Sequence, residues 1–242
     1  MLNSVVKRHG HLLERTLANG LVASGRFDVL VEVAIPVTDA ARELLLARNS
    51  AEDLARITIR ADASAERIVS IDLVVIDPEV GWAGAYEVKR GNGAIDGRSR
   101  RPIEHDLKAT RMVLPSYLAK RGYPNITRVT TGVIDYYGAT GISKELKIGH
   151  DDLNGHFGVP VRETLDKVST CLQEALHAEL PQLFASVLEA IQHGKVKPQP
   201  GPAQTVAHDG HLDTALIEII NARPTGPGPR KPPAFMQTPR SA

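Results

Sequence analysis

The chain has 242 residues, of which 42% are hydrophobic, so it can bury a sizeable core and is expected to form one main domain with extensions. Its formal net charge of +1 excludes a strongly basic surface overall, so nucleic-acid binding would need a local patch. The single cysteine, Cys171, excludes an internal disulfide and a cysteine-based zinc site, and the lack of a long apolar run or a basic leader predicts a cytoplasmic protein without membrane contact.

A helix and a strand are predicted first. Leucines recur at every fourth position within residues 4–23, which is typical of an amphipathic helix, and Glu14 lies on that helix. Apolar residues alternate along 26–37, which predicts the first strand. One face of this strand is expected to hold Phe27, Val29, Val31, Val33 and Ile35.

An insertion is predicted between the first two core strands, at residues 38–65. Thr38 and Ser50 are residue types that cap helices, so each is expected to begin a short helix. Residues 57–59 are β-rich and predict a short strand. No chemistry is assigned to this segment.

The stretch 67–90 predicts a β-hairpin, because two apolar, β-branched runs flank a turn that contains proline and glycine. With the turn centred near Val80, Asp72 falls almost opposite Lys89. Glu87 lies one step along the same face. The other face suits a packed core and holds Ile71, Leu73, Val75, Tyr86 and Val88.

Two carboxylates and an ammonium therefore converge on an otherwise apolar hairpin. Asp72 and Glu87 repel each other unless a cation lies between them, and a divalent metal with oxygen ligands is the natural choice. Lys89 beside such a metal can orient or deprotonate a water. A lone Glu-x-Lys is more often a solvent-facing polar stripe, but the three residues together, beside long apolar runs, favour a metal site.

A basic, glycine-bearing loop at 91–101 follows the hairpin. Residues 102–120 then predict a helix that Pro115 kinks or splits. Since the loop leaves directly from the Glu-x-Lys strand, its arginines are placed to contact phosphates. The expected nucleic-acid contacts from this region are Arg90, Arg98, Arg100, Arg101 and His105.

Residues 126–137 predict the fourth strand. The order of elements up to residue 138 is then helix, strand, strand, strand, helix, strand. This segment, 1–138, is interpreted as the core domain.

A helical extension is predicted at 139–194. A long loop is expected to come first, at 139–159, followed by an amphipathic helix that Pro181 breaks. The helices at 161–193 offer a surface for a homodimer. Residues 195–242 are rich in proline and glycine and predict a disordered tail with a short helix at about 212–222.

The hairpin resembles the signature of the PD-(D/E)xK superfamily, the restriction-endonuclease-like nucleases. In that signature an Asp opens the second core strand and a Glu-x-Lys follows in the third. Asp72 and Glu87-Val88-Lys89 match it, with Ile71 where the family name has proline. A rival alignment through Asp77 is rejected, because this residue lies at the turn.

The resemblance implies an α/β fold with a restriction-endonuclease-like αβββαβ core, a central mixed sheet flanked by helices, and a C-terminal helical extension. It implies a metal-dependent nuclease that hydrolyses phosphodiester bonds, with DNA as the expected substrate and Mg²⁺ or Mn²⁺ as the cofactor. The implied metal ligands are Asp72, Glu87, the Val88 carbonyl and Glu14 of the first helix. The implied catalytic residues are Asp72, Glu87, Lys89 and, on the helix after the hairpin, Lys108.

An alternative function is open at this point. The same fold can serve as a non-catalytic module that binds nucleic acid or a protein partner, and the near-neutral charge and sparse aromatics fit that module equally well. Metal binding separates the two functions. A sugar- or nucleotide-processing α/β enzyme has no supporting motif.

Overall fold

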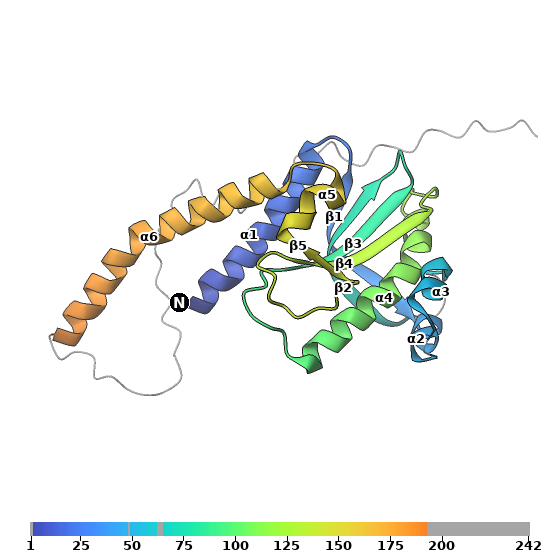
Figure 1. The fold of residues 1–242 in the computed structure, drawn as a ribbon, viewed down its shortest axis with the longest axis horizontal. Helices are drawn as coiled ribbons and strands as arrows, with labels where there is room; N and C mark the ends of the chain where they lie inside the picture. The colour runs from blue at the N-terminus through green and yellow to red at the C-terminus, as the bar shows by residue number, and fades with distance from the viewer. Residues whose placement is uncertain (1, 48, 62–64, 193–242) are drawn as a thin grey trace, which may run out of the picture.

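The computed structural model describes residues 2–47, 49–61 and 65–192. Its centre is a five-stranded mixed sheet in the order β1-β2-β3-β4-β5 (Figure 1). The first three strands pair antiparallel, and β4 and β5 continue the sheet parallel to β3. The expected α/β class, a mixed sheet flanked by helices, is confirmed. The predicted tail and its short helix at 212–222 lie outside the described residues.

The strands are built from the β-branched runs of the sequence. Because helices cover both faces of the sheet, the central strands are apolar on both sides rather than strictly alternating. The strands span Asp28–Thr38 (β1), Ala65–Asp77 (β2), Trp82–Lys89 (β3), Arg128–Asp135 (β4) and Lys147–Gly149 (β5).

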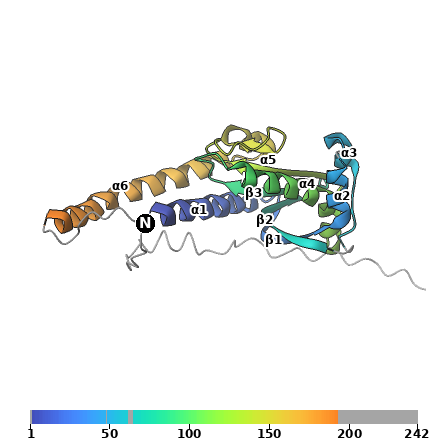
Figure 2. The ribbon, with the colours of Figure 1, turned by 90° about the horizontal axis from the view of Figure 1, so that it is seen from below.

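The helices form two layers, one on each face of the sheet (Figures 1 and 2). One layer consists of α4, with the short helices α2 and α3 packed against it. The other consists of α1, α5 and the beginning of α6. Beyond that beginning, α6 projects away from the sheet. The helices span Leu2–Ala23 (α1), Asp39–Leu46 (α2), Ala51–Arg56 (α3), Gly97–Lys120 (α4), Leu153–Phe157 (α5) and Arg162–Gln192 (α6).

Each layer encloses its own hydrophobic core. The core on the α4 side contains Leu107 and Leu114, and that on the α1 side contains Leu17 and Tyr86, all fully or almost fully buried. Burying a side chain of this size contributes about 1.5–3 kcal/mol, so both helical layers are held mainly by these contacts. The sheet and everything anchored in it are therefore fixed from both sides.

The first strand changes face partway along its length. Phe27 packs in the α1-side core, whereas Val33 and Ile35 pack in the α4-side core, although strict alternation would place all three on one face. Glu32 lies between them with a φ of 51°, and Val31 is 47% exposed. The single apolar face expected for residues 26–37 is therefore wrong, because one left-handed residue rotates the remainder of the strand.

The second strand changes face opposite the first. Ile71 packs in the α4-side core and Leu73 in the α1-side core. The prediction that they share a face is therefore wrong. Asp72 lies between them. The pairs Val31↔Leu73 and Val33↔Ile71 place Asp72 opposite Glu32. In both strands the apolar side chains therefore switch from one face of the sheet to the other at the same position along the strands, and Asp72 lies at that position.

The insertion folds largely as predicted. The Thr38 side chain accepts a hydrogen bond from the Ala41 backbone (3.4 Å) and caps α2, and Ser50 accepts from Asp53 N (3.1 Å) and caps α3. Residues 57–59 are not a strand in the structure. Instead, the Ile59 N–H donates to the carbonyl of Met112 on α4 (2.8 Å), which ties the insertion to that helix.

Helix α4 starts five residues before the position predicted. Asp96 caps it by accepting from the backbone N–H groups of Arg98 (2.8 Å) and Ser99 (3.0 Å), so 97–101 are helical rather than a flexible loop. The helix also continues through Pro115 without splitting. Its neighbours are deeply buried, and their packing offsets the one hydrogen bond that proline removes.

The segment after residue 138 also differs from the prediction. Residues 139–159 are not one long loop, because they contribute β5, a short 3-10 helix, His150–Asp152, and α5. The sheet therefore extends past the boundary that the sequence suggested for the core. Helix α6 runs through Pro181 unbroken, since the φ of proline is compatible with a helix. Among the described helices, none is both long and apolar enough to cross a membrane.

The left-handed conformation of Glu32 should cost stability that glycine would recover. We expect Glu32→Gly to raise the free energy of unfolding by about 1 kcal/mol, because glycine adopts a positive φ without steric cost. Glu32→Val should lower it, since a β-branched side chain fits this conformation worst. Thermal unfolding should show the difference as shifts of about 2–4 °C in opposite directions. Equal losses in both variants would contradict this account.

Candidate functional site

The three charged residues predicted on the hairpin, Asp72, Glu87 and Lys89, lie close together where the pairing of β2 with β3 ends. The last pair of the ladder is Leu73↔Tyr86. One residue further, the Oδ2 of Asp72 accepts a hydrogen bond from the backbone N–H of Val88 at 2.7 Å. A side-chain carboxylate thus replaces the main-chain partner at the point where the strands diverge.

Lys89 lies between the two carboxylates. Its Nζ is 2.6 Å from Oε2 of Glu87 and 3.9 Å from Oδ2 of Asp72. The register corrects one detail of the prediction, because continuing the ladder places Asp72 opposite Glu87 rather than opposite Lys89. All three predicted residues are nevertheless brought together, with 24% of the Asp72 side chain and 15% of the Glu87 side chain exposed.

Glu14 reaches the same cluster from α1. Burial, and then the negative charge of Asp72, raise the pKa of Glu14, while His11 and Lys89 act against this rise. His11 Nδ1 lies 3.3 Å from Oε2 of Glu14. The glutamate that the sequence singled out on the first helix is therefore within electrostatic range of both Asp72 and Lys89.

Burial and mutual repulsion make the carboxylates costly to ionise. Burial raises the pKa of Glu87, Asp72 raises it further, and Lys89 only partly compensates. Burial alone would lower the pKa of Lys89, but the hydrogen bond with Glu87 and the negative charges of Glu87, Asp72 and Glu14 together outweigh burial and raise it. The cluster thus holds one strongly retained positive charge and an excess of negative charge, an arrangement that favours a further cation.

The donors suit a cation that needs few protein ligands. Across the described residues, no group of three or more histidine, cysteine, aspartate or glutamate side chains is placed to hold a metal ion. Mg²⁺ commonly uses only one or two carboxylates and completes its shell with water and substrate phosphates. Asp72 and Glu87 meet that requirement, and Glu14 is an additional carboxylate within electrostatic range of Asp72.

Two further charged residues border Glu87 that the sequence did not single out. Arg67 of β2 and Asp106 of α4 form an ion pair. Together with Glu87 they line a small pocket of about 160 Å³ on the α4 side of the sheet. In the sequence, Asp106 is only a charged residue on the helix after the hairpin. The packing of α4 against the sheet brings Asp106 to the same pocket as Glu87.

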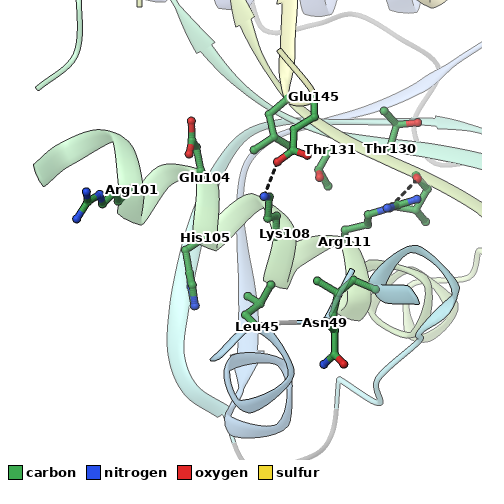
Figure 3. A pocket seen from close by; sticks show the side chains of 13 residues that line it. Leu45, Asn49, Arg101, Glu104, His105, Lys108, Arg111, Thr130, Thr131 and Glu145 are labelled. Atoms are coloured by element: carbon green, nitrogen blue, oxygen red, sulfur yellow. Dashed lines mark hydrogen bonds and ion pairs between the residues drawn. The ribbon is translucent and has the colours of Figure 1, made fainter. Parts of the chain in front are cut away.

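Lys108 and His105 lie in a different hollow. It measures about 520 Å³ and is formed by α4, β4 and the insertion, with Arg101 also on its lining. Figure 3 shows Lys108 pointing toward Glu145, with which it forms an ion pair. The structure therefore brings these predicted residues together with one another, but not with Glu87, which lines the smaller pocket.

The other predicted basic contacts are dispersed. Arg98 is exposed at the start of α4, and Arg100 donates to the carbonyl of Gly141 at 2.9 Å. Arg90 instead continues directly from Lys89, and its guanidinium lies 5.6 Å from the ring centre of Tyr137. Of the predicted nucleic-acid contacts, Arg90 is thus the one adjacent in the chain to the carboxylate cluster.

Asp77, the rival for the position of Asp72, has a structural role. Its Oδ2 accepts from Nε of Arg26 at 2.6 Å, and its Oδ1 accepts from the backbone of Val80 at 3.3 Å. The side chain is almost fully buried. These bonds fix the hairpin turn to the start of β1, at the end of the hairpin opposite to Lys89.

Comparison with models of known families, with curated proteins and with solved structures gives no significant match to this chain. The resemblance to the PD-(D/E)xK superfamily therefore depends on the hairpin residues and the order of elements. That order, helix, strand, strand, strand, helix, strand, is present in the structure, with α2 and α3 inserted after β1.

The raised pKa of Glu14 predicts the direction in which its removal changes the stability of the fold. In metal-free buffer at pH 7, ionised Glu14 should destabilise the fold, because its folded pKa lies above its unfolded one. Glu14→Gln should therefore raise the melting temperature, by an amount corresponding to no more than about 1 kcal/mol. This gain should shrink as the pH falls toward 4, because Glu14 of the wild type then takes up a proton and its repulsion with Asp72 is relieved.

Melting curves of both proteins between pH 4 and pH 7 in EDTA would test this prediction. Glu79→Gln is the matched control, since Glu79 is exposed at the hairpin turn. A loss of stability in Glu14→Gln at pH 7 would show that the carboxylate is a favourable partner of His11 rather than a strained member of the cluster.

Proposed function

We propose that this protein is a metal-dependent nuclease that hydrolyses phosphodiester bonds, with DNA as its substrate. The observation that supports this most directly is the convergence of Asp72, Glu87 and Lys89 at the divergence of β2 and β3. The approach of Glu14 from α1 adds to it. Two half-buried carboxylates with an adjacent ammonium suit phosphoryl-transfer chemistry, and the raised pKa of Glu87 indicates that its charge is a cost to the fold.

Each residue has a separate role in the proposed reaction. Asp72 and Glu87, with the backbone carbonyl of Val88, would hold Mg²⁺ or Mn²⁺, and Glu14 would add a carboxylate directly or through water. The metal, when bound, polarises the phosphoryl group and offsets its charge. Lys89 orients the attacking water and stabilises the negative charge that develops on the phosphate oxygens. The Asp72–Val88 hydrogen bond fixes the carboxylate before substrate arrives.

A homodimer through residues 161–193 is part of this proposal. A second copy of the chain would cover apolar side chains that α6 leaves exposed. Helix α6 projects from the body of the protein, and Leu180 on it is 36% exposed. The alternative, a non-catalytic module that binds nucleic acid or protein, requires no metal, so metal binding distinguishes the two functions.

Metal binding should stabilise the wild type and not a variant without the Glu87 charge. At about ten times its dissociation constant, Mg²⁺ or Mn²⁺ should add about 1.4 kcal/mol to stability by mass action. For a domain of this size that corresponds to a rise of about 3–6 °C in melting temperature. The shift should disappear in Glu87→Gln, which keeps the shape of the side chain but not its charge.

Glu145→Gln is the control for the melting experiment, because Glu145 pairs with Lys108 in the other hollow. It should keep the full metal-dependent shift. Equal shifts in the wild type and in Glu87→Gln would place the metal elsewhere and remove the main support for the nuclease.

Catalysis should depend on the three hairpin residues. We expect Asp72→Asn, Glu87→Gln and Lys89→Met each to slow hydrolysis of a plasmid or a labelled oligonucleotide by at least about 100-fold, since each removes a charge from the reacting centre. Lys120→Met serves as the control, because Lys120 is an exposed lysine at the far end of α4. Wild-type rates in the Asp72 and Glu87 variants would refute the assignment and favour the non-catalytic module.

A further inference from the structure

A groove lies beside the carboxylate cluster, between α1 and α6. It measures about 530 Å³, within the usual range for pockets that bind small ligands or single nucleotides. Leu172 and Leu176 of α6 form an apolar wall. His9 of α1, Arg90 and Tyr137 contribute the polar and aromatic lining.

Backbone hydrogen bonds connect this groove directly to the cluster. The N–H of Tyr136 donates to the carbonyl of Lys89 at 3.1 Å, and the N–H of Tyr137 donates to the carbonyl of Arg90 at 2.9 Å. The lining residues therefore begin one position after the lysine of the proposed active site. A ligand in the groove would lie at the same edge of the sheet as Lys89, where the parallel strands end and ligands of α/β proteins commonly bind.

Tyr137 provides an aromatic surface in a fixed position. Its ring is 50% exposed, yet it packs against the rings of Tyr136 (centroids 4.9 Å apart) and His9 (6.1 Å). The loop that carries it is anchored by buried Asp135, which accepts from Gly138 N (3.0 Å) and from the Thr140 hydroxyl (2.6 Å). A half-exposed aromatic ring held in this way loses little freedom when another ring stacks on it.

Arg90 supplies a cation with an unused donor. Its Nε is buried and has no hydrogen-bond partner among the described residues, while its guanidinium lies 5.6 Å from the Tyr137 ring. The Arg90 side chain lines the groove, so the rest of its guanidinium is placed to meet a ligand there. A phosphate is the natural acceptor for a guanidinium at this position.

Two other polar groups of the groove already have partners within the protein. Asp166, its only carboxylate in the described lining, accepts from the Tyr136 hydroxyl at 2.9 Å and lies 2.7 Å from Nε2 of His150. His9 lies 3.4 Å from the Ser169 hydroxyl. Burial and then Arg90 lower the pKa of His9, so it stays neutral at pH 7 and adds no charge to the groove.

We propose that this groove binds an unpaired nucleotide next to the scissile phosphate, so that the substrate of the site is single-stranded DNA. The base stacks on Tyr137 against the leucines of α6, and its phosphate is held by Arg90. A base within a duplex does not offer its face to a side chain, whereas an unpaired base does. This inference deepens the proposed function and rests on it for the identity of the substrate.

Binding of labelled oligonucleotides in EDTA tests the proposal without any cleavage. We expect a deoxythymidine oligomer of about 15 residues to bind at least about tenfold more tightly than the duplex formed with its complement, at a fixed salt concentration. Tyr137→Ala and Arg90→Gln should each weaken binding of the single strand by about tenfold. Tyr137→Phe should bind as the wild type does, because it keeps the ring.

The chain contains a matched control for the arginine. Arg121 also stacks on a tyrosine, Tyr117, with 4.6 Å from its guanidinium to the ring centre. It lies at the C-terminal end of α4, whereas Arg90 precedes the N-terminal end of that helix. Arg121→Gln removes the same charge and should change affinity by less than about twofold. Equal losses in Arg90→Gln and Arg121→Gln, or equal affinities for single strand and duplex, would overturn the proposal.

A second readout does not depend on comparing affinities. Tyr137→Trp should keep single-strand binding, and stacking of a base should quench the fluorescence of the new tryptophan well beyond any change at Trp82 in the wild type. No additional quenching at saturating oligonucleotide would also overturn the proposal. Melting curves of all variants in the same buffer establish that they are folded.

The failures of the two proposals are distinguishable. If Tyr137→Ala and Arg90→Gln weaken binding but no metal-dependent hydrolysis is found, the nucleotide-binding groove is supported and the nuclease activity is refuted. If Glu87→Gln abolishes hydrolysis while Tyr137→Ala binds the single strand as the wild type does, the nuclease activity is supported and the nucleotide-binding groove is refuted.

Discussion

The hydrogen bond from the Val88 N–H to the Asp72 carboxylate is the contact on which the candidate site depends. It lies where β2 and β3 stop pairing, so a buried backbone donor would otherwise lose its partner. The reversal of faces at Glu32 and Asp72 places that carboxylate between the two hydrophobic cores rather than within either. A side chain that ends a ladder in this way is held by the sheet itself, which gives the site a rigid base.

The cluster is costly for the fold, and the cores offset that cost. Glu14 and Glu87 are both harder to ionise than they would be in water, and Glu32 adopts a backbone conformation that non-glycine residues rarely use. Such costs are usually retained where they serve binding or chemistry. Glu87 lies in the central strand β3, Glu32 in the edge strand β1 and Glu14 on α1, and the two hydrophobic cores around them contain enough buried apolar side chains to tolerate these costs.

Sequence reasoning located the hairpin, its three charged residues and Glu14, because these follow from local periodicity and from a short motif. It placed Asp72 opposite Lys89 because the exact centre of a turn decides the register, and the sequence around Val80 leaves that centre open. It could not detect the change of face at Glu32, because counting odd and even positions assumes an unbroken strand. The approach of Asp106 to Glu87 depends on how α4 packs, which no local pattern specifies.

The groove beside the candidate site is a product of the sheet topology. Strands β3 and β4 are parallel, so their carboxyl ends meet at one edge, and the chain leaves that edge through Arg90 after one strand and Tyr136 and Tyr137 after the other. The two segments are more than forty residues apart in the sequence and therefore carry no shared signal. Once the parallel pairing is formed, Lys89 and Arg90 are fixed beside the aromatic pair. Under the proposed function, a strand of DNA whose phosphate reached the carboxylate cluster would have its neighbouring base beside Tyr137, which would link the position of the chemistry to the form of the substrate.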